Sequence, residues 1–158
     1  MRQIIRNNQG FTWVELIVVM VILGIISAVV LSGMVSSDTE LAARTEVIKT
    51  HLRYAQSRAM NSNTVWYIKF SGNSYSLYKK DGGADPTLLP GADSSTVVLP
   101  GSISIDYGII DVVSFDGLGK PCTDSSAQVA QASDRSLTIT AGSDSRIITI
   151  TKNTGFIQ

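Results

Sequence analysis

A single cysteine, Cys122, and a single histidine, His51, are found among the 158 residues of the sequence. One cysteine excludes an intrachain disulfide bond and a zinc site made of several cysteines. The 13 basic and 13 acidic side chains cancel, so the overall charge gives no sign of a polyanionic partner, and nucleic-acid binding is not expected. We expect Cys122 to be a loop residue without a specific function.

No arrangement of residues typical of a catalytic centre or a metal site is apparent in the sequence. His51 has no evident partner for either role, so we expect it to face solvent or to be hydrogen bonded within the fold. The segment from Asp116 to Lys120 has too few glycines for a phosphate loop and predicts a hairpin turn. The aspartates are scattered and occur mostly in turn-like segments: Asp81, Asp85, Asp93, Asp106, Asp111, Asp116 and Asp124. We therefore expect no enzyme and no cofactor, with a membrane-anchored hydrolase as the remote alternative.

The sequence does contain one long apolar segment. Between Leu16 and Val35 only two serines and two glycines interrupt a run of aliphatic residues, methionines and alanine. A helix of about 20 such residues matches the hydrocarbon core of a bilayer. Arg2 and Arg6 precede the run, and the first acidic residue after it is Asp38. Because positive charge favours the cytoplasmic side, we expect a single membrane span with a cytoplasmic N-terminus and an exported C-terminal domain.

A carboxylate, Glu15, lies at the start of this apolar segment. Burial of an unpaired charge in a bilayer costs about 2.5–3.5 kcal/mol on insertion scales, so Glu15 must either reach water at the headgroups or find a cation. The apolar run is too long for an ordinary secretory signal, and the residues after it lack a good Ala-x-Ala-like cleavage site. On these grounds alone an uncleaved membrane anchor remains possible.

The residues Gly10-Phe11-Thr12-Trp13-Val14-Glu15-Leu16 resemble the processing motif of type IV prepilins and type II secretion pseudopilins. In that family a short basic leader is removed on the cytoplasmic side between glycine and phenylalanine, and a glutamate follows four residues after the new N-terminus. The resemblance implies that prepilin peptidase removes residues 1–10, cleaving between Gly10 and Phe11, and that the same enzyme N-methylates Phe11. It also implies a role in assembly for Glu15.

Cleavage before an apolar helix creates an ammonium group on Phe11 that has no aqueous partner once subunits pack together. Glu15 lies one helical turn further on, so its carboxylate can neutralise the ammonium of its own subunit or that of a neighbour. The family resemblance implies the neighbour. Two departures from the family pattern affect the helix only: Trp13 replaces the usual leucine, and Ser32-Gly33 lies where many major pilins have a kinking proline.

The residues from Asp38 to Asn61 continue with an amphipathic helical pattern and contain no proline. The apolar positions expected to face a core are Leu41, Val47, Ile48, Leu52, Ala55 and Ala59. We expect one long, bent helix from Phe11 that extends for roughly 75 Å. Its transmembrane and assembly part covers 11–37, and its amphipathic part covers 38–62. The basic residues Arg44, Lys49, Arg53 and Arg58 alternate with Glu40 and Glu46, which indicates a solvated helix surface.

A period of two residues begins after Asn63 and predicts a sheet whose aromatic side chains belong to the core. The expected strands are 65–70 and 75–80, joined by a turn at 71–74, then 97–99, 102–107, 112–116, 135–140 and 146–151, with the tail 153–157 closing the sheet. Segment 81–95 is expected to be a surface loop, and 122–133 a mobile loop. The predicted fold class is α+β and pilin-like: a long N-terminal helix packed on an antiparallel β-sheet domain. The pilin-like domain is expected to cover 38–158. It includes the amphipathic part of the helix and a β-rich region at 64–158.

The exported part looks like the GspH/FimT branch of minor prepilin-like proteins. The resemblance rests on Leu52–Ala59 followed by strands, on a Phe-x-x-x-Gly turn from Phe115 to Gly119, and on the terminal pair Thr154-Gly155. It implies a structural minor subunit of a type II secretion pseudopilus that assembles through its N-terminal helix, at or near the fibre tip, and supports protein export. A FimT/FimU-like minor pilin of a type IV pilus, acting in pilus assembly, adhesion or DNA uptake, is the alternative.

The same resemblance implies the partners and the location of the protein. The partners are other pilin or pseudopilin subunits, prepilin peptidase and the inner-membrane assembly platform. The protein is expected to cross the bacterial inner membrane once, with its C-terminal domain in the periplasm, before it enters the pseudopilus or pilus.

Overall fold

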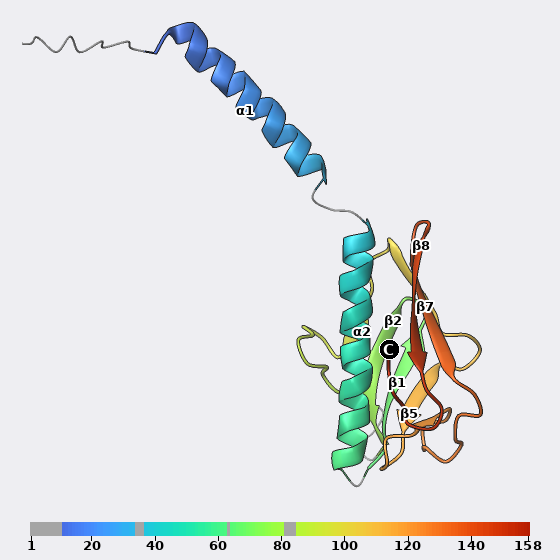
Figure 1. The fold of residues 1–158 in the computed structure, drawn as a ribbon. Helices are drawn as coiled ribbons and strands as arrows, with labels where there is room; N and C mark the ends of the chain where they lie inside the picture. The colour runs from blue at the N-terminus through green and yellow to red at the C-terminus, as the bar shows by residue number, and fades with distance from the viewer. Residues whose placement is uncertain (1–10, 34–36, 63, 81–84) are drawn as a thin grey trace, which may run out of the picture. The chain divides into compact units, whose positions relative to one another are not determined.

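The computed structural model describes residues 11–33, 37–62, 64–80 and 85–158. The chain divides into two compact units, Met1–Ser36 and Ser37–Gln158 (Figure 1). The first unit contains helix α1 (Trp13–Gly33), and the second contains helix α2 (Ser37–Asn61) followed by eight strands. Residues 34–36 lie outside the described part of the chain, so the continuity of the predicted long helix stays a prediction.

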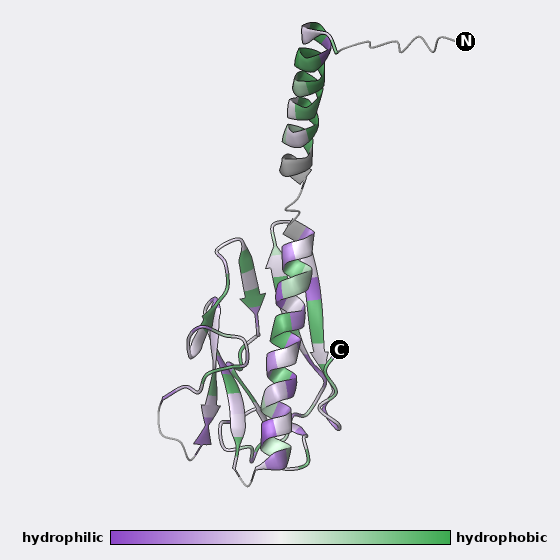
Figure 2. Ribbon diagram, turned by 90° about the vertical axis from the view of Figure 1, so that its left-hand side faces the viewer, coloured by the Kyte–Doolittle hydropathy of each residue, from purple (hydrophilic) through white to green (hydrophobic). Residues whose placement is uncertain are grey.

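Helix α1 begins after Thr12, which acts as its N-cap. The Thr12 carbonyl accepts a hydrogen bond from the Leu16 N–H at 3.2 Å, and its hydroxyl oxygen accepts one from the Glu15 N–H at 3.3 Å. The apolar side chains from 13 to 29 are exposed around the helix. In Figure 2 the ribbon of this helix is mostly green, the colour of hydrophobic residues. Counting only the described residues, no helix combines the length and the apolar composition needed to cross a membrane.

Helix α2 buries one stripe against the strands. The stripe has helical spacing and comprises Leu41, Thr45, Ile48, Leu52, Ala55 and Ala59. It confirms the predicted core face except at Val47, whose side chain is exposed because it lies one position to the side of Ile48. On the exposed side of α2, Arg44 forms an ion pair with Glu40, with Nη2 3.9 Å from Oε1.

The strands form two antiparallel sheets. The five-stranded sheet has the order β3-β2-β1-β5-β6, and the three-stranded sheet has the order β4-β7-β8. The strands are β1 (Trp66–Ser71), β2 (Ser74–Lys79), β3 (Thr96–Val98), β4 (Ile103–Asp106), β5 (Val112–Phe115), β6 (Pro121–Cys122), β7 (Arg135–Ala141) and β8 (Asp144–Ile150). Each predicted strand is present, but the division into two sheets was not predicted, because alternation along a strand does not reveal its neighbours.

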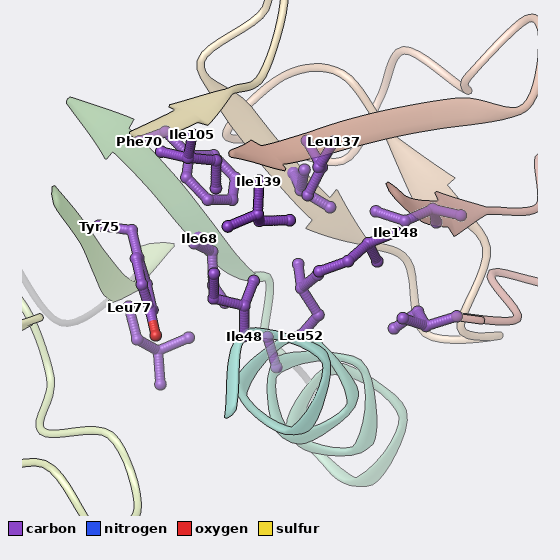
Figure 3. Close-up of a cluster of buried hydrophobic side chains, with 14 of the residues drawn as sticks. Ile48, Leu52, Ile68, Phe70, Tyr75, Leu77, Ile105, Leu137, Ile139 and Ile148 are labelled. Atoms are coloured by element: carbon purple, nitrogen blue, oxygen red, sulfur yellow. The ribbon is translucent and has the colours of Figure 1, made fainter. Parts of the chain in front are cut away.

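The core lies between α2 and the two sheets. Ile48 and Leu52 of α2 point toward side chains of β1 and β7, among them Ile68 and Ile139 (Figure 3). Alternate residues of β1 are buried as predicted, and Tyr75 of β2 is also buried. The aromatic side chains therefore belong mainly to the core, as the sequence indicated.

Two segments predicted as loops are more structured than expected. Cys122 is not a loop residue, since it belongs to β6 and is buried. Within the predicted surface loop 81–95, the Leu89 side chain is buried, and the Thr87 N–H donates to the Leu77 carbonyl at 2.7 Å. Both errors have one cause: short strands and single buried side chains leave no periodic pattern in the sequence. The predicted tail is found beside β8, where Ile157 forms a bridge with Ile150.

Candidate functional site

The predicted processing site is partly within the described chain. Gly10 lies outside the described residues, whereas Phe11 is 82% exposed and precedes the N-cap Thr12. Trp13 is also exposed, at 83%. In the predicted cleavage product, Phe11 would therefore be the first residue and would lie outside the helix. The N-cap Thr12 would follow it directly. The cleavage and methylation at this position stay predictions.

Glu15 occupies the third position of α1, and Thr12 and Glu15 have the spacing of a capping box. A carboxylate in the first turn interacts favourably with the unpaired N–H groups of the helix start. Within the described part of the chain, Glu15 forms no ion pair. The geometry thus holds the backbone of Glu15 in a defined turn, close in sequence to the amine that cleavage would create.

The motifs that carry the GspH/FimT resemblance meet at one side chain, Gln56. Its amide nitrogen Nε2 lies 2.8 Å from the carbonyl oxygen of Gly119, 3.1 Å from that of Gly155 and 3.3 Å from that of Thr154. The helix segment, the turn after β5 and the terminal Thr-Gly pair are therefore joined in space. Sequence reasoning named all three motifs but missed their contact. We call this group, Gln56, Gly119, Thr154 and Gly155, the glutamine junction.

Both glycines of the glutamine junction have a backbone that only glycine adopts easily, with φ of +81° at Gly119 and +64° at Gly155. A Cβ atom on Gly155 would lie 2.2 Å from the Gly119 carbonyl oxygen. The close approach of two backbones therefore requires glycine. The turn itself is fixed by Asp116, whose carboxylate accepts hydrogen bonds from the N–H groups of Leu118 and Lys120 at 2.9 and 2.8 Å. The predicted hairpin turn is confirmed.

His51 is buried and hydrogen bonded on both ring nitrogens. Nε2 lies 3.1 Å from the Pro90 carbonyl oxygen, and Nδ1 lies 2.9 Å from the Tyr75 hydroxyl. A carbonyl only accepts, so Nε2 carries the proton and Nδ1 accepts from Tyr75. Burial lowers the pKa of His51. Of the two alternatives expected for His51, the hydrogen-bonded one is found and the solvent-facing one is not. This side chain attaches α2 to β2 and to Pro90.

The basic residues of α2 also have local partners. Lys49 Nζ lies 2.8 Å from Glu46 Oε1, Arg53 donates to the Ile157 carbonyl at 2.8 Å, and Arg58 lies over the Trp66 ring at 4.6 Å. This agrees with a solvated helix surface. Within the described ranges, no group of three or more His, Cys, Asp or Glu residues is placed to hold a metal ion.

The architecture is that of a pilin-like subunit. It comprises a capped apolar helix and a separate domain in which a second helix packs on antiparallel sheets. Residues 5–31 match the prokaryotic N-terminal methylation motif, and residues 44–155 match the family described as type II transport protein GspH. The chain belongs to the GspH family. The resemblance drawn from Gly10–Leu16 and from the Leu52–Ala59 region is thereby confirmed.

The fold is also found in solved structures. A crystal structure of the type IV minor pilin FimU from Pseudomonas aeruginosa (strain PAO1) matches with a TM-score of 0.54 and 16% identity, covering 77% of this chain and 88% of that chain. A second crystal form of FimU matches with a TM-score of 0.51, also at 16% identity, covering 74% of this chain and 90% of that chain. No curated protein matches the sequence. At this identity the likeness establishes the pilin-like α+β fold.

The family and the fold are those of structural pilin subunits, which assemble with other subunits of the same class. The chain is therefore a minor pilin or pseudopilin. The methylation motif and the family also indicate a pilin anchored in a membrane. The apolar run that was predicted to span the membrane extends beyond the described side chains, so its detailed topology stays a prediction.

Proposed function

We propose that this protein is a minor pseudopilin of a type II secretion system, placed at or near the tip of the pseudopilus, where it supports protein export. The observation that carries the proposal is the match of residues 44–155 to the GspH family, together with the methylation motif at 5–31. The match to the GspH family covers nearly the whole exported domain, including all three motifs of the glutamine junction.

The proposed maturation follows from the chemistry of the N-terminus. Prepilin peptidase cleaves the bond between Gly10 and Phe11 and methylates the new amine, which retains its positive charge. When α1 packs among neighbouring subunits, this charge loses its water, and the Glu15 carboxylate of an adjacent subunit neutralises it. The capped first turn at Thr12 supports this role because it holds the backbone of Glu15 in helical geometry before assembly.

The proposed location follows from the sequence around α1. Arg2 and Arg6 hold the N-terminus in the cytoplasm, the apolar run crosses the inner membrane once, and the domain from 38 onward lies in the periplasm. The inner-membrane assembly platform then moves the subunit from the bilayer into the fibre. In this scheme the protein acts by packing and surface contacts alone, so we propose that it is not an enzyme.

Two measurements in the native bacterium test the proposal. Mass spectrometry of the mature chain is expected to find N-methylated phenylalanine, Phe11, as its first residue, whereas an uncut chain in cells with an active prepilin peptidase would contradict the maturation step. Deletion of the gene is expected to abolish type II secretion and to leave type IV pili intact. The opposite result, lost pili with normal secretion, would establish the alternative, a FimU-like minor pilin of a type IV pilus.

A further inference from the structure

An open groove of about 480 Å³ lies between the two connections that cross from one sheet to the other. One wall is formed by 107–110, on the way from β4 to β5, and the other by 129–136, on the way from β6 into β7. Because β4 and β7 belong to one sheet and β5 and β6 to the other, the groove marks the place where the sheets separate. We call it the crossover groove.

Both walls are held in place by hydrogen bonds between charged side chains and backbone groups. Arg135 donates to the Val112 carbonyl at 2.7 Å, to the Tyr107 carbonyl at 3.2 Å and to the Ile110 carbonyl. Within the connection from β6 to β7, the Asp124 carboxylate accepts hydrogen bonds from the N–H groups of Gln128 and Val129, at 3.0 and 2.8 Å. The shape of the groove therefore exists before any partner binds, which reduces the entropy lost on association.

The rim of the crossover groove exposes apolar side chains at positions where loops usually carry polar ones. Ile109 is fully exposed, and Val129 on the opposite wall is 56% exposed. Aliphatic side chains beside a preformed groove are typical of a protein contact surface, because they lose water only when a partner covers them. The crossover groove thus combines a concave floor with an apolar rim.

A buried acceptor in the same wall lacks a donor. The side chain of Gln131 is only 8% exposed, and its oxygen Oε1 has no hydrogen-bond partner among the described residues. Its amide nitrogen donates to the carbonyls of Ser133 at 2.7 Å and Ile150 at 3.2 Å, which fixes the orientation of the carboxamide. A buried acceptor without a donor is destabilising, so this wall holds an unsatisfied hydrogen-bonding group behind its surface.

The charged groups around the crossover groove favour a basic partner. Asp134 lines the groove, Asp106 precedes its first wall, and both carboxylates are exposed. Asp111 is paired with Lys69 at 3.8 Å. Arg135 also lines the groove, but its guanidinium N–H groups donate to backbone carbonyls inside the protein. The outward-facing charge that remains on Asp106 and Asp134 is negative and complements a lysine or arginine.

We propose that the crossover groove is the docking site for another pilin-like subunit of the same fibre, which inserts an aliphatic side chain and places a lysine or arginine beside Asp106 and Asp134. This inference rests on the proposed function, since it assigns the partner surface of a fibre subunit. The aliphatic side chain covers Ile109 and Val129, and the basic group pairs with the carboxylates of Asp106 and Asp134.

Site-specific crosslinking in the native bacterium tests the docking site. A photoreactive phenylalanine analogue replaces Ile109 in the full chain, and the matched control carries it in place of Ile147, an exposed isoleucine on β8. The Ile109 position is expected to crosslink to a second pilin-like subunit with a yield at least about fivefold above the control. The crosslinked peptide should contain an aliphatic residue within two positions of a lysine or arginine. Equal yields, or a crosslink to lipid or to a secreted protein, would overturn the proposal.

A second set of variants tests whether the negative charges of Asp106 and Asp134 are needed for docking. Asp106→Asn and Asp134→Asn together remove two charges but keep the oxygens that accept from the Gly108 and Lys152 N–H groups. This double variant is expected to lower the crosslink yield about threefold or more, whereas Asp144→Asn, an exposed aspartate at the start of β8, leaves it unchanged. An unaltered yield in the double variant would overturn the assignment of a basic partner.

Failure of the docking site can be distinguished from failure of the proposed function. If the unmodified chain is processed at Phe11 and enters the fibre, but Ile109 gives no crosslink to a subunit, only the docking site is wrong. If the unmodified chain is not processed or never enters the fibre, the proposed function itself is wrong.

Discussion

The side-chain amide of Gln56 donates a hydrogen bond to the Gly119 carbonyl at 2.8 Å, although the two residues are 63 positions apart in the sequence. The same amide reaches the carbonyl of Gly155 near the end of the chain. One helical side chain therefore joins the turn between β5 and β6 to the terminal segment. The integrity of the domain is expected to depend on this junction.

The first prediction concerns Gly155. Gly155→Ala should destabilise the domain more than Gly142→Ala, because both glycines have nearly the same φ, +64° and +61°, but only a Cβ on Gly155 meets other atoms. The backbone cost of alanine at such a φ is about 1–2 kcal/mol, which Gly142→Ala measures alone. The overlap with the Gly119 carbonyl should add at least about 1 kcal/mol at Gly155. Urea unfolding of both variants gives the comparison, and equal losses would refute the importance of the close contact.

The second prediction separates two roles of Glu15. Glu15→Ala and Glu15→Gln should both insert into the membrane, and both should lower fibre incorporation at least about tenfold, because one unpaired buried charge costs about 3–5 kcal/mol. Glutamine can still complete a capping box, so Glu15→Gln removes only the charge. Fractionation of membranes and sheared fibres provides the measurement. If Glu15→Gln assembles normally, helix capping is the role of this residue, and charge neutralisation is not.

A suitable control for the Glu15 variants is Glu40→Ala. Glu40 lies in α2 and forms an exposed pair with Arg44 at 3.9 Å, a type of contact that contributes little to stability. Its removal should leave both insertion and assembly intact.

The third prediction concerns acid sensitivity through His51. Burial lowers the pKa of His51 in the folded state, so the folded protein holds this side chain neutral. Its contribution to stability is complete above the unfolded pKa of about 6.5 and is lost as the pH falls from there toward the lower folded pKa. The urea midpoint should therefore decrease between pH 7.5 and pH 5, and His51→Gln should reduce this decrease. The same pH dependence in both proteins would exclude His51 as its source.

The fourth prediction concerns Cys122. Its thiol is buried in β6, and burial together with the nearby carboxylates of Asp116 and Asp124 raises its pKa. A raised pKa lowers the fraction of Cys122 present as thiolate, and burial limits the access of the reagent to the sulfur. Both effects slow alkylation. The folded protein should react with iodoacetamide at pH 8 much more slowly than the protein in urea, and it should remain monomeric on non-reducing gels. Rapid reaction of the folded protein, or a disulfide-linked dimer, would contradict the structure.

The parts of the fold that sequence could predict are those with a regular pattern. Alternation identified the buried face of β1, Trp66, Ile68 and Phe70, and helical spacing identified most of the buried stripe of α2. Val47 was assigned wrongly because neighbouring positions 47 and 48 are both apolar, and the spacing does not show which one faces the core. Cys122 was assigned wrongly because a two-residue strand has no period.

Long-range contacts were beyond the reach of sequence reasoning. The contact of Gln56 with Gly119 and Gly155 joins three motifs that were recognised separately, but no local pattern indicates that they touch. The partners of His51, Tyr75 and the Pro90 carbonyl, come from distant segments for the same reason. At the N-terminus, by contrast, the spacing of Thr12 and Glu15 is a local capping-box pattern that the sequence reasoning missed, although the cap was within its reach.

Side chains of α2 are hydrogen bonded to both sheets or to the segments beside them. His51 binds Tyr75 of the five-stranded sheet, and Arg53 binds the terminal segment beside β8 of the three-stranded sheet. Gln56 binds both the turn between β5 and β6 and the terminal segment. A force applied to α2 is therefore carried into both sheets, and pulling α2 away from one sheet also strains its hydrogen bonds to the other.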